Sequence, residues 1–212
     1  SEKELKDNVL LFFLAGHETT ATGLCFSLYT LAKHPEMQER IYEEINSVLG
    51  TDFIGKTVTK ADMEKLEYFQ AFHNEVLRLY PPVSVLTYRT LEKNSEQIDD
   101  LKIKKGQRVS IHILNVHHNP EYWDNPEEFN PERFINKDKK RPHFAFMPFG
   151  IGPRLCIGNH FSLLEQKIFL IQTLLRFKVE MADPNYKMQL GGAGPLLVTD
   201  PNFEVVLKPR TN

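Results

Sequence analysis

The chain has 212 residues, of which 41% are apolar, and its formal net charge is −2. This composition suits a globular core, and the near-neutral charge argues against a nucleic-acid partner. Two cysteines cannot build a disulfide framework, which indicates a reducing compartment. The polar start SEKELKDNV is not a signal peptide, and the longest apolar run, residues 9–16, is far shorter than the roughly 20 residues of a membrane-spanning helix.

Helical patterns dominate the first part of the chain. Three long helices are expected, over residues 3–33, 35–50 and 59–80. Gly16 and Gly23 interrupt the first helical pattern, Pro35 starts the second helix, and Pro81 ends the third. No start signal except Ser1 precedes the first helix, so we expect the sequence to be a fragment of a longer protein.

The second part of the chain changes character. Residues 83–114 are β-branched and alternating, with KKG as a turn, which predicts short strands in a small sheet. Residues 115–148 are rich in Pro and Asn and predict a long ordered loop with short helical turns. A strongly apolar helix is expected over residues 158–177, followed by loops and a β-hairpin. The expected fold class is mainly α with small β-sheets.

One of the two cysteines, Cys156, lies in the glycine-rich loop FGIGPRLCIG, residues 149–158. A thiol just before a helix faces free backbone N–H groups and the positive end of the helix dipole, and both favour the thiolate. Three glycines permit tight turns and close approach to a flat ligand: Gly150, Gly152 and Gly158. Arg154 could pair with an anionic group of that ligand. These features fit an axial ligand of haem iron, with a buried structural cysteine as the alternative.

The segment AGHETT, residues 15–20, places a glycine, an acid and hydroxyls inside an apolar helix. Thr19 could bond to a backbone carbonyl or to an incoming polar ligand, and Glu18 could supply protons. An ordinary polar helix face is the alternative reading.

Glu75 and Arg78 are spaced i and i+3, so an ion pair is expected on one helix face. Their apolar surroundings suggest burial and a further partner, whereas a surface pair would contribute little. His117 and His118 invite a metal reading, but no second ligand cluster supports it, and surface or loop-packing histidines are expected.

The cysteine loop resembles the haem-binding signature of the cytochromes P-450, the haem-thiolate monooxygenases. The pattern Phe-x-x-Gly-x-Arg-x-Cys-x-Gly is matched by Phe149, Gly152, Arg154, Cys156 and Gly158. The AGHETT, Glu-x-x-Arg and Pro-Glu-Arg-Phe segments occur in that family's order across the chain. The resemblance implies the C-terminal portion of a single haem-binding domain over residues 1–212, with the N-terminal half absent.

The resemblance also implies a role for each matched residue. Cys156 would ligate the iron of haem b, Glu18 and Thr19 would deliver protons during oxygen activation, and Ala15 and Gly16 would form a groove over the haem. A buried structural network would join Glu75, Arg78 and Arg133. Arg89 would direct its charge at a haem propionate, with a solvated strand arginine as the alternative.

The implied function is insertion of one oxygen atom from O2 into a lipophilic substrate. Substrate contacts are expected from apolar residues in three segments, 11–15, 83–86 and 194–197, which include Leu11, Leu14, Val83, Val85, Leu86, Pro195 and Leu196. Fatty acids, sterols and xenobiotics all remain open as substrates. The electrons would come from a flavin reductase or a ferredoxin.

A basic cluster over residues 136–143, with Lys137, Lys139, Lys140 and Arg141, would steer an acidic reductase, or would simply be a solvated loop. The expected location is the cytosolic face of the endoplasmic reticulum membrane or the cytoplasm, with membrane association through the missing N-terminal region.

Three other readings stay open. The chain could be an inactive truncated fragment, and these residues alone are expected to fold poorly and to bind haem weakly or not at all. It could be a haem-thiolate protein that uses peroxide or rearranges an oxidised lipid. It could be a cysteine hydrolase, although the Gly and Arg residues around Cys156 fit haem better.

Overall fold

The computed structural model describes residues 1–50, 57–93, 96–98, 100–136, 141–191, 195–200 and 202–210. Its helices are α1 (Glu2–Lys33), α2 (Pro35–Leu49), α3 (Lys60–Met63), α4 (Glu67–Leu79), α5 (Ile113–His117), α6 (Glu132–Ile135) and α7 (Asn159–Arg176), with 3-10 turns η1 (His143–Ala145) and η2 (Gly152–Arg154). Its strands are β1 (Arg89–Thr90), β2 (Glu96–Ile98), β3 (Leu101–Ile103), β4 (Arg108–Val109), β5 (Phe177–Met181) and β6 (Val205–Pro209). The expected fold class, mainly α with small sheets, is confirmed.

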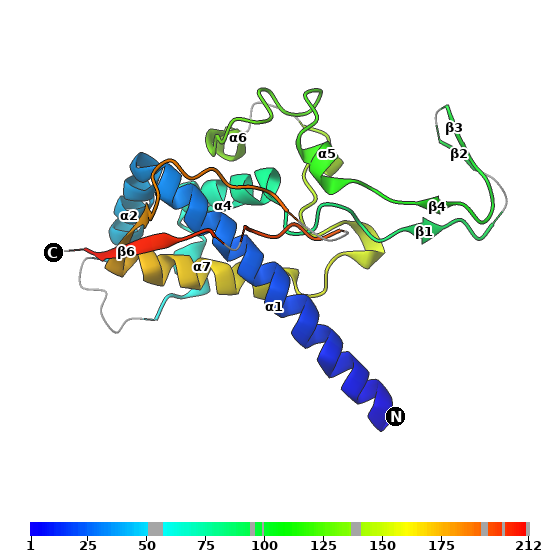
Figure 1. Ribbon diagram of the computed structural model, residues 1–212, viewed down its shortest axis with the longest axis horizontal. Helices are drawn as coiled ribbons and strands as arrows, with labels where there is room; N and C mark the ends of the chain where they lie inside the picture. The colour runs from blue at the N-terminus through cyan, green and yellow to red at the C-terminus, as the bar shows by residue number, and fades with distance from the viewer. Residues whose placement is uncertain are drawn as a thin grey trace.

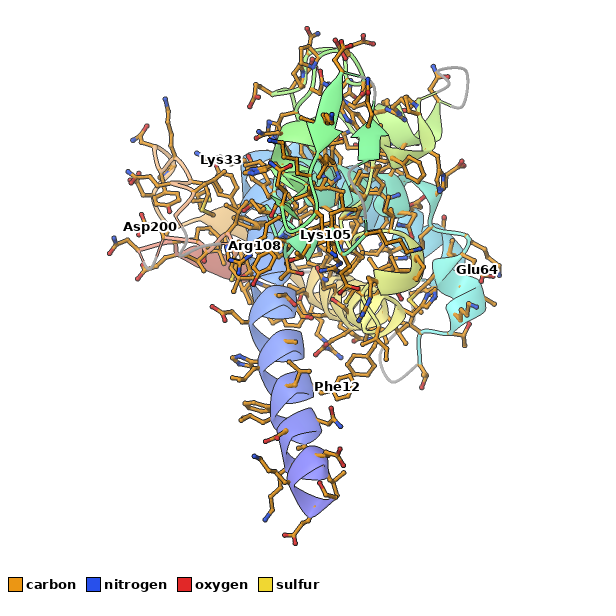
Figure 2. All side chains as sticks on the ribbon, turned by 90° about the vertical axis from the view of Figure 1, so that its right-hand side faces the viewer. Phe12, Lys33, Glu64, Lys105, Arg108 and Asp200 are labelled. Atoms are coloured by element: carbon orange, nitrogen blue, oxygen red, sulfur yellow. The ribbon has the colours of Figure 1, made fainter. Side chains whose placement is uncertain are left out.

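Helix α1 is the longest element, and it is continuous through Gly16 and Gly23. A capping box at Ser1 starts it: the Ser1 Oγ accepts from the Glu4 amide at 3.3 Å, and the α-amino group donates to the Glu4 carboxylate at 2.5 Å. Its N-terminal half stands clear of the rest of the described chain (Figures 1 and 2), and Phe12 projects from this free part. Its C-terminal half is buried at Phe26 and Leu31.

By length and composition alone, α1 could cross a membrane, although only 22% of its most apolar window is buried here. The sequence reading considered the short run of residues 9–16, whereas the whole helix has 32 residues. Core helices of soluble proteins pass the same test. The burial of Phe26 and Leu31 shows that the C-terminal part of α1 serves as a core helix.

The core lies where α1, α2, α4 and α7 pack together (Figure 1). Its fully buried side chains include Phe26, Ile41, Ile45, Phe72, Leu170 and Leu174. Burial of such a side chain stabilises a fold by about 1.5–3 kcal/mol relative to exposure.

The helix expected over residues 59–80 is divided into α3 and α4. Helix α3 has its own capping box, between Thr59 and Asp62. Helix α4 has no cap from its own sequence; instead the Glu44 carboxylate of α2 accepts from the amides of Tyr68 and Phe69 at 2.8 and 2.9 Å. A carboxylate at a helix N-terminus is favourable, so a neighbouring helix determines where α4 begins.

The strands form two-stranded antiparallel pairs: β1 with β4, β2 with β3, and β5 with β6. The described part of residues 83–114 therefore holds two small pairs rather than one small sheet, and strands β1 to β4 lie in an arm at the right of Figure 1. Gly106, in the expected KKG turn, has φ +86°, which favours glycine. In the tail, β6 pairs with β5 in the register Phe177 opposite Pro209. Residues 115–148 contain short helical elements, as expected, but residues 137–140 lie outside the described residues.

Candidate cofactor-binding site

A cavity of about 790 Å³ lies between α1, the segment after α4, and the cysteine loop. Among the residues singled out from sequence, its lining includes Ala15, Gly16, Thr19, Val83, Leu86, Phe149, Gly150, Arg154, Cys156 and Gly158. Apolar residues not singled out complete it, including Phe12, Phe13, Leu77, Ile113 and Phe161. A largely apolar cavity of this volume suits a flat organic group.

The conformation of the cysteine loop, residues 149–158, is set by its glycines and by one backbone hydrogen bond. Gly150 and Gly152 have φ values of +75° and +70°, where other residues are strained. The Cys156 amide donates to the Phe149 carbonyl at 3.0 Å, which closes the loop. Gly158 has an ordinary φ of −87°, so its expected turning role is not needed; an added Cβ there would lie 4.0 Å from the Cys156 sulfur.

Cys156 is an exposed free thiol on the cavity wall, three residues before α7 begins at Asn159. The other thiol, Cys25, is half-buried, and burial raises its pKa. Only Cys156 is therefore placed to ligate a group in the cavity.

The donor set fits a haem better than a bare metal ion. Within the described residues, no group of three or more His, Cys, Asp or Glu side chains could hold a metal ion. A single thiolate therefore needs an iron that already carries other ligands, as in haem. Arg154 lies on the cavity wall, is exposed, and has no ion-pair partner in the described part of the chain. It could pair with a carboxylate of the bound group.

The AGHETT segment of α1, residues 15–20, borders the same cavity; we call it the acid–alcohol segment after Glu18 and Thr19. The Thr19 Oγ1 donates to the Ala15 carbonyl at 2.8 Å. Thr19 and Ala15 line the cavity, and an added Cβ at Gly16 would meet nothing within 4 Å, so the wall is open there. Glu18 is exposed and is not part of the lining.

The expected substrate segments after α4 and in the tail lie side by side. Val83 pairs with Leu196 in an antiparallel bridge, and the Ser84 amide donates to the Pro195 carbonyl at 2.7 Å. Val85 bridges to His112. Gly194 lies outside the described residues. Several of the expected contact residues are absent from the cavity lining: Leu11, Leu14, Val85, Pro195 and Leu196.

Arg89 and Gly152 also lie outside the cavity lining. The Arg89 side chain is exposed and donates to the Thr87 carbonyl and hydroxyl at 3.2 and 3.1 Å. This local bonding holds the guanidinium beside its own strand.

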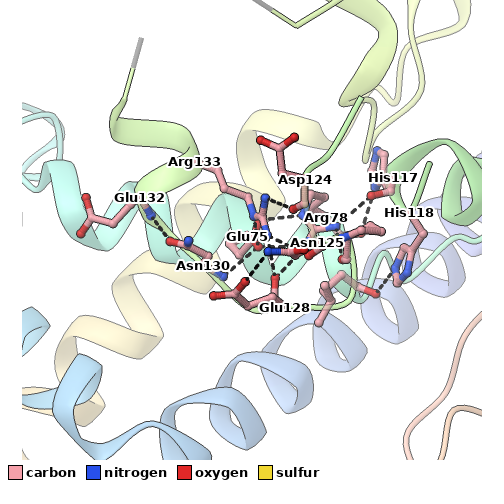
Figure 3. Close-up of polar contacts among 12 residues, drawn as sticks. Glu75, Arg78, His117, His118, Asp124, Asn125, Glu128, Asn130, Glu132 and Arg133 are labelled. Atoms are coloured by element: carbon pink, nitrogen blue, oxygen red, sulfur yellow. Dashed lines mark hydrogen bonds and ion pairs between the residues drawn. The ribbon is translucent and has the colours of Figure 1, made fainter. Parts of the chain in front are cut away.

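A buried ionic network centres on Glu75 and Arg78 of α4 (Figure 3). Arg78 donates to both oxygens of Glu75, at 2.7 and 2.8 Å, and Arg133 donates to the same carboxylate at 3.2 Å. The side chains of Glu75 and Arg78 are fully buried. Arg78 also donates to three backbone carbonyls, that of His117 at the end of α5 and those of Pro126 and Glu128 in the loop that follows. The network therefore ties α4 to the long loop that precedes the cysteine segment.

His117 is a buried structural histidine. Its Nε2 accepts from the Met147 amide at 2.9 Å, so its Nδ1 carries the proton and donates to the Arg78 carbonyl at 3.1 Å. Burial lowers the pKa of His117 to about 4, which keeps the ring neutral. The ring links α4 to the segment just before the cysteine loop, and this packing role agrees with the expectation for His117.

Sequence reasoning missed a second buried polar group beside the cavity. It consists of Thr20, His73, Ser162 and Gln166, which are joined by side-chain hydrogen bonds. The one available signal was Gln166, a polar residue within the strongly apolar helix α7.

The chain matches a family model described as Cytochrome P450 over residues 1–206. It is 40% identical over 184 residues to Cytochrome P450 4A10 of Rattus norvegicus, covering 87% of this chain and 35% of that protein. It is 38% identical over 216 residues to Cytochrome P450 9e2 of Blattella germanica, covering 100% of this chain and 40% of that protein. The chain thus spans well under half the length of these relatives.

Solved structures of the same kind match the fold. Retinoic acid bound cyanobacterial CYP120A1 superposes with a TM-score of 0.88 at 33% identity, covering 99% of this chain and 47% of that one. A zebra fish cytochrome P450 with progesterone superposes with a TM-score of 0.79 at 31% identity, covering 94% and 44% of the two chains.

Proposed function

Since the chain belongs to the cytochrome P450 family, we propose that residues 1–212 form the C-terminal portion of one haem-binding domain. The complete protein would be a haem-thiolate monooxygenase that inserts one atom of O2 into a lipophilic substrate. The observation that carries this proposal is the exposed Cys156 thiol on the wall of a large apolar cavity. The match of 94–99% of this chain to less than half of each solved structure supports a portion of a larger domain.

Haem b, held through Cys156, would supply the redox chemistry for oxygen activation. The chain's own residues prepare the cavity for that group. Phe149 and Leu86 exclude water from it, and Arg154 pairs with an anionic edge.

Thr19 and Glu18 would manage protons in different ways. Because Thr19 donates its hydroxyl proton to the Ala15 carbonyl, its oxygen is left to accept a hydrogen bond on the cavity side. Neighbouring residues on a helix do not face each other, and Glu18 is exposed. We expect Glu18 to exchange protons with solvent and to reach the cavity through water.

The apolar wall favours a lipophilic substrate. The ligands of two similar structures, retinoic acid and progesterone, support this class. We place the substrate contacts at Val83 and Leu86, with the bridged residue Leu196 behind Val83.

A flavin reductase or a ferredoxin would supply electrons. Lys137, Lys139 and Lys140 of the expected docking cluster lie outside the described residues. Arg141 packs over the Trp123 ring at 4.5 Å and donates to the Arg133 carbonyl, so it serves packing rather than docking. The cytosolic face of the endoplasmic reticulum membrane or the cytoplasm remains the proposed location.

The test is a carbon monoxide difference spectrum of the reduced, full-length protein beside Cys156→Ser. We expect a strongly red-shifted Soret band that the substitution abolishes. Cys25→Ser is the matched control, and it should keep the band because Cys25 is not part of the cavity lining. An unshifted band that Cys156→Ser leaves unchanged would refute the proposed function.

A further inference from the structure

A chain of polar side chains crosses the junction of α1, α4 and α7 beside the cavity. His73 Nε2 lies 3.2 Å from Gln166 Oε1, and Gln166 Nε2 lies 3.0 Å from Ser162 Oγ. Ser162 Oγ in turn lies 3.0 Å from Thr20 Oγ1. His73 and Gln166 are 0% and 1% exposed, so the bond between them is protected from water, whereas the two bonds to Ser162 are partly buried. The large majority of buried polar side-chain atoms in proteins are hydrogen-bonded, as those of these four side chains are, with the exception of His73 Nδ1.

The chemistry of the groups sets the direction of the bonds. An amide oxygen can only accept, so His73 Nε2 carries the proton and donates to Gln166. The Gln166 nitrogen therefore faces Ser162 and donates to its hydroxyl. Burial lowers the pKa of His73 to about 4, so the ring is neutral near neutral pH. Its Nδ1 has no hydrogen-bond partner among the described residues.

We propose that Gln166 is a positioning residue: its amide, oriented by His73, fixes the Ser162 and Thr20 hydroxyls and sets the spacing of α1 and α7 at the cavity. Thr20, Ser162 and Gln166 all line the cavity. Thr20 directly follows Thr19, so the position of this contact decides where the acid–alcohol segment lies relative to the cysteine loop. The proposal rests on the proposed function.

A proton route is the other role that such a chain could have, and its composition argues against it. A side-chain amide donates from nitrogen and accepts at oxygen, but it does not pass a proton between the two near neutral pH. A proton from His73 would therefore stop at Gln166. These hydrogen bonds instead fix geometry: His73 orients the Gln166 amide, and the amide orients the Ser162 hydroxyl that contacts Thr20.

The close approach at Gly23 ties Gln166 to the spacing of the helices. A Cβ at residue 23 would lie 2.6 Å from Gln166 Oε1 and 3.2 Å from its Cδ. The amide is bonded on both sides and buried, so it cannot swing aside without breaking a bond. Gly23 and Gln166 are thus a matched pair: a methyl group at residue 23 displaces the amide or separates the helices.

The first test is a double-mutant cycle in the full-length protein with Gly23→Ala, Gln166→Ala and both together. Alanine favours a helix over glycine, so Gly23→Ala would stabilise α1 if nothing were in the way. We expect Gly23→Ala alone to raise the unfolding equilibrium constant about tenfold, and this rise to disappear in the Gln166→Ala background. Additive effects of the two substitutions would overturn the matched spacing, whether or not the protein is a monooxygenase.

The second test compares Gln166→Leu with Gln38→Leu. Gln38 is 3% exposed and bridges α2 to the Leu31 carbonyl and to both backbone groups of Val179, away from the cavity lining. Both substitutions remove a buried glutamine, so both should lower stability. The readout is spectral titration of the full-length haem protein with imidazole and with 4-phenylimidazole, whose phenyl group needs clearance against α1.

We expect Gln166→Leu to change the ratio of the two dissociation constants at least about threefold, because small displacements alter a close fit. Gln38→Leu should leave the ratio within error. Equal ratios in the two variants would overturn the positioning role. If Gln166→Leu loses haem, Ser162→Ala decides, since it removes the link to Thr20 with a smaller change; an unaltered ratio there would also overturn the proposal. A wild-type protein without the red-shifted band would instead refute the proposed function.

Discussion

The substitution Glu75→Gln in the full-length protein tests the buried network most directly. It keeps the shape of the side chain but removes its charge. In the structure the carboxylate accepts two bonds from Arg78, one from Arg133 at 3.2 Å, and one from the Asn130 amide at 2.9 Å. Without that charge, the fully buried Arg78 guanidinium loses its anionic partner and keeps only neutral acceptors, the glutamine amide oxygen and the backbone carbonyls of His117, Pro126 and Glu128.

Removing one partner of a buried ion pair costs about 3–5 kcal/mol. The three carbonyls around Arg78 soften the loss, so we expect the lower end, about 3 kcal/mol. The measurement is the apparent free energy of unfolding from urea titrations followed by circular dichroism. Glu132→Gln is the control. Its ion pair with Arg40, at 2.7 Å, is about half exposed, so its loss should lower the free energy of unfolding by less than about 1 kcal/mol.

A loss from Glu75→Gln no larger than that from Glu132→Gln would refute the reasoning. The double substitution Glu75→Gln with Arg78→Met adds a second check. It removes the stranded charge, so it should recover part of the stability that Glu75→Gln loses. A double variant that loses the sum of both single effects would show that the charge pair was not the cause.

Further predictions follow from the same structure. Thr19→Ala should release more peroxide per electron consumed by the complete enzyme, whereas Thr19→Ser should restore coupling; tight coupling in Thr19→Ala would contradict the proton role. Gly150→Ala should destabilise the cysteine loop by about 1 kcal/mol or more because of φ +75°, measured as faster haem loss, while Gly191→Ala, outside the cavity lining and with no positive φ, should not. Folding lowers the pKa of His117 from about 6.5 to about 4, so the free energy of unfolding should fall as the pH drops from about 6.5 towards 4, and the contribution of His117 to this fall should be about 3 kcal/mol. His117→Gln should make the pH profile from urea titrations shallower, with the contribution of His73 remaining, and an unchanged slope would contradict the assignment. Residues 1–212 expressed alone should bind haem substoichiometrically, because Leu10, Phe13 and other large apolar residues of α1 are exposed; full thiolate-ligated binding would refute this.

Local signals predicted the long helices well. Pro35 lies at the start of α2, and the apolar pattern of α7 ends within a residue of its expected end. The division between α3 and α4 could not be predicted, because the Glu44 carboxylate that starts α4 belongs to another helix. A helix boundary set by a tertiary contact leaves no mark in the local sequence.

In the candidate site, too, local motifs could be predicted from the sequence, whereas contacts created by helix packing could not. The resemblance to the cytochromes P-450 assigned Cys156, Arg154 and Thr19 to one haem site, and the structure places all three on the wall of one cavity. The spacing of Glu75 and Arg78 predicted their pairing, and the apolar neighbours predicted their burial. The contact of Gln166 with His73 joins residues 93 positions apart, and only the packing of α4 against α7 creates it.

The continuity of α1 makes it a mechanical lever. Its anchored end, at Phe26 and Leu31, lies in the core, while its other part, at Ala15 and Thr19, forms the cavity wall. Eleven or twelve residues of helix span about 17 Å, so a tilt of about 5° at Leu31 would move Thr19 by about 1.5 Å. A displacement of about 1 Å can cost a hundredfold in rate. Substitutions that repack α1 at Phe26 or Leu31 would therefore lower the reaction rate of the complete protein, although neither residue lines the cavity.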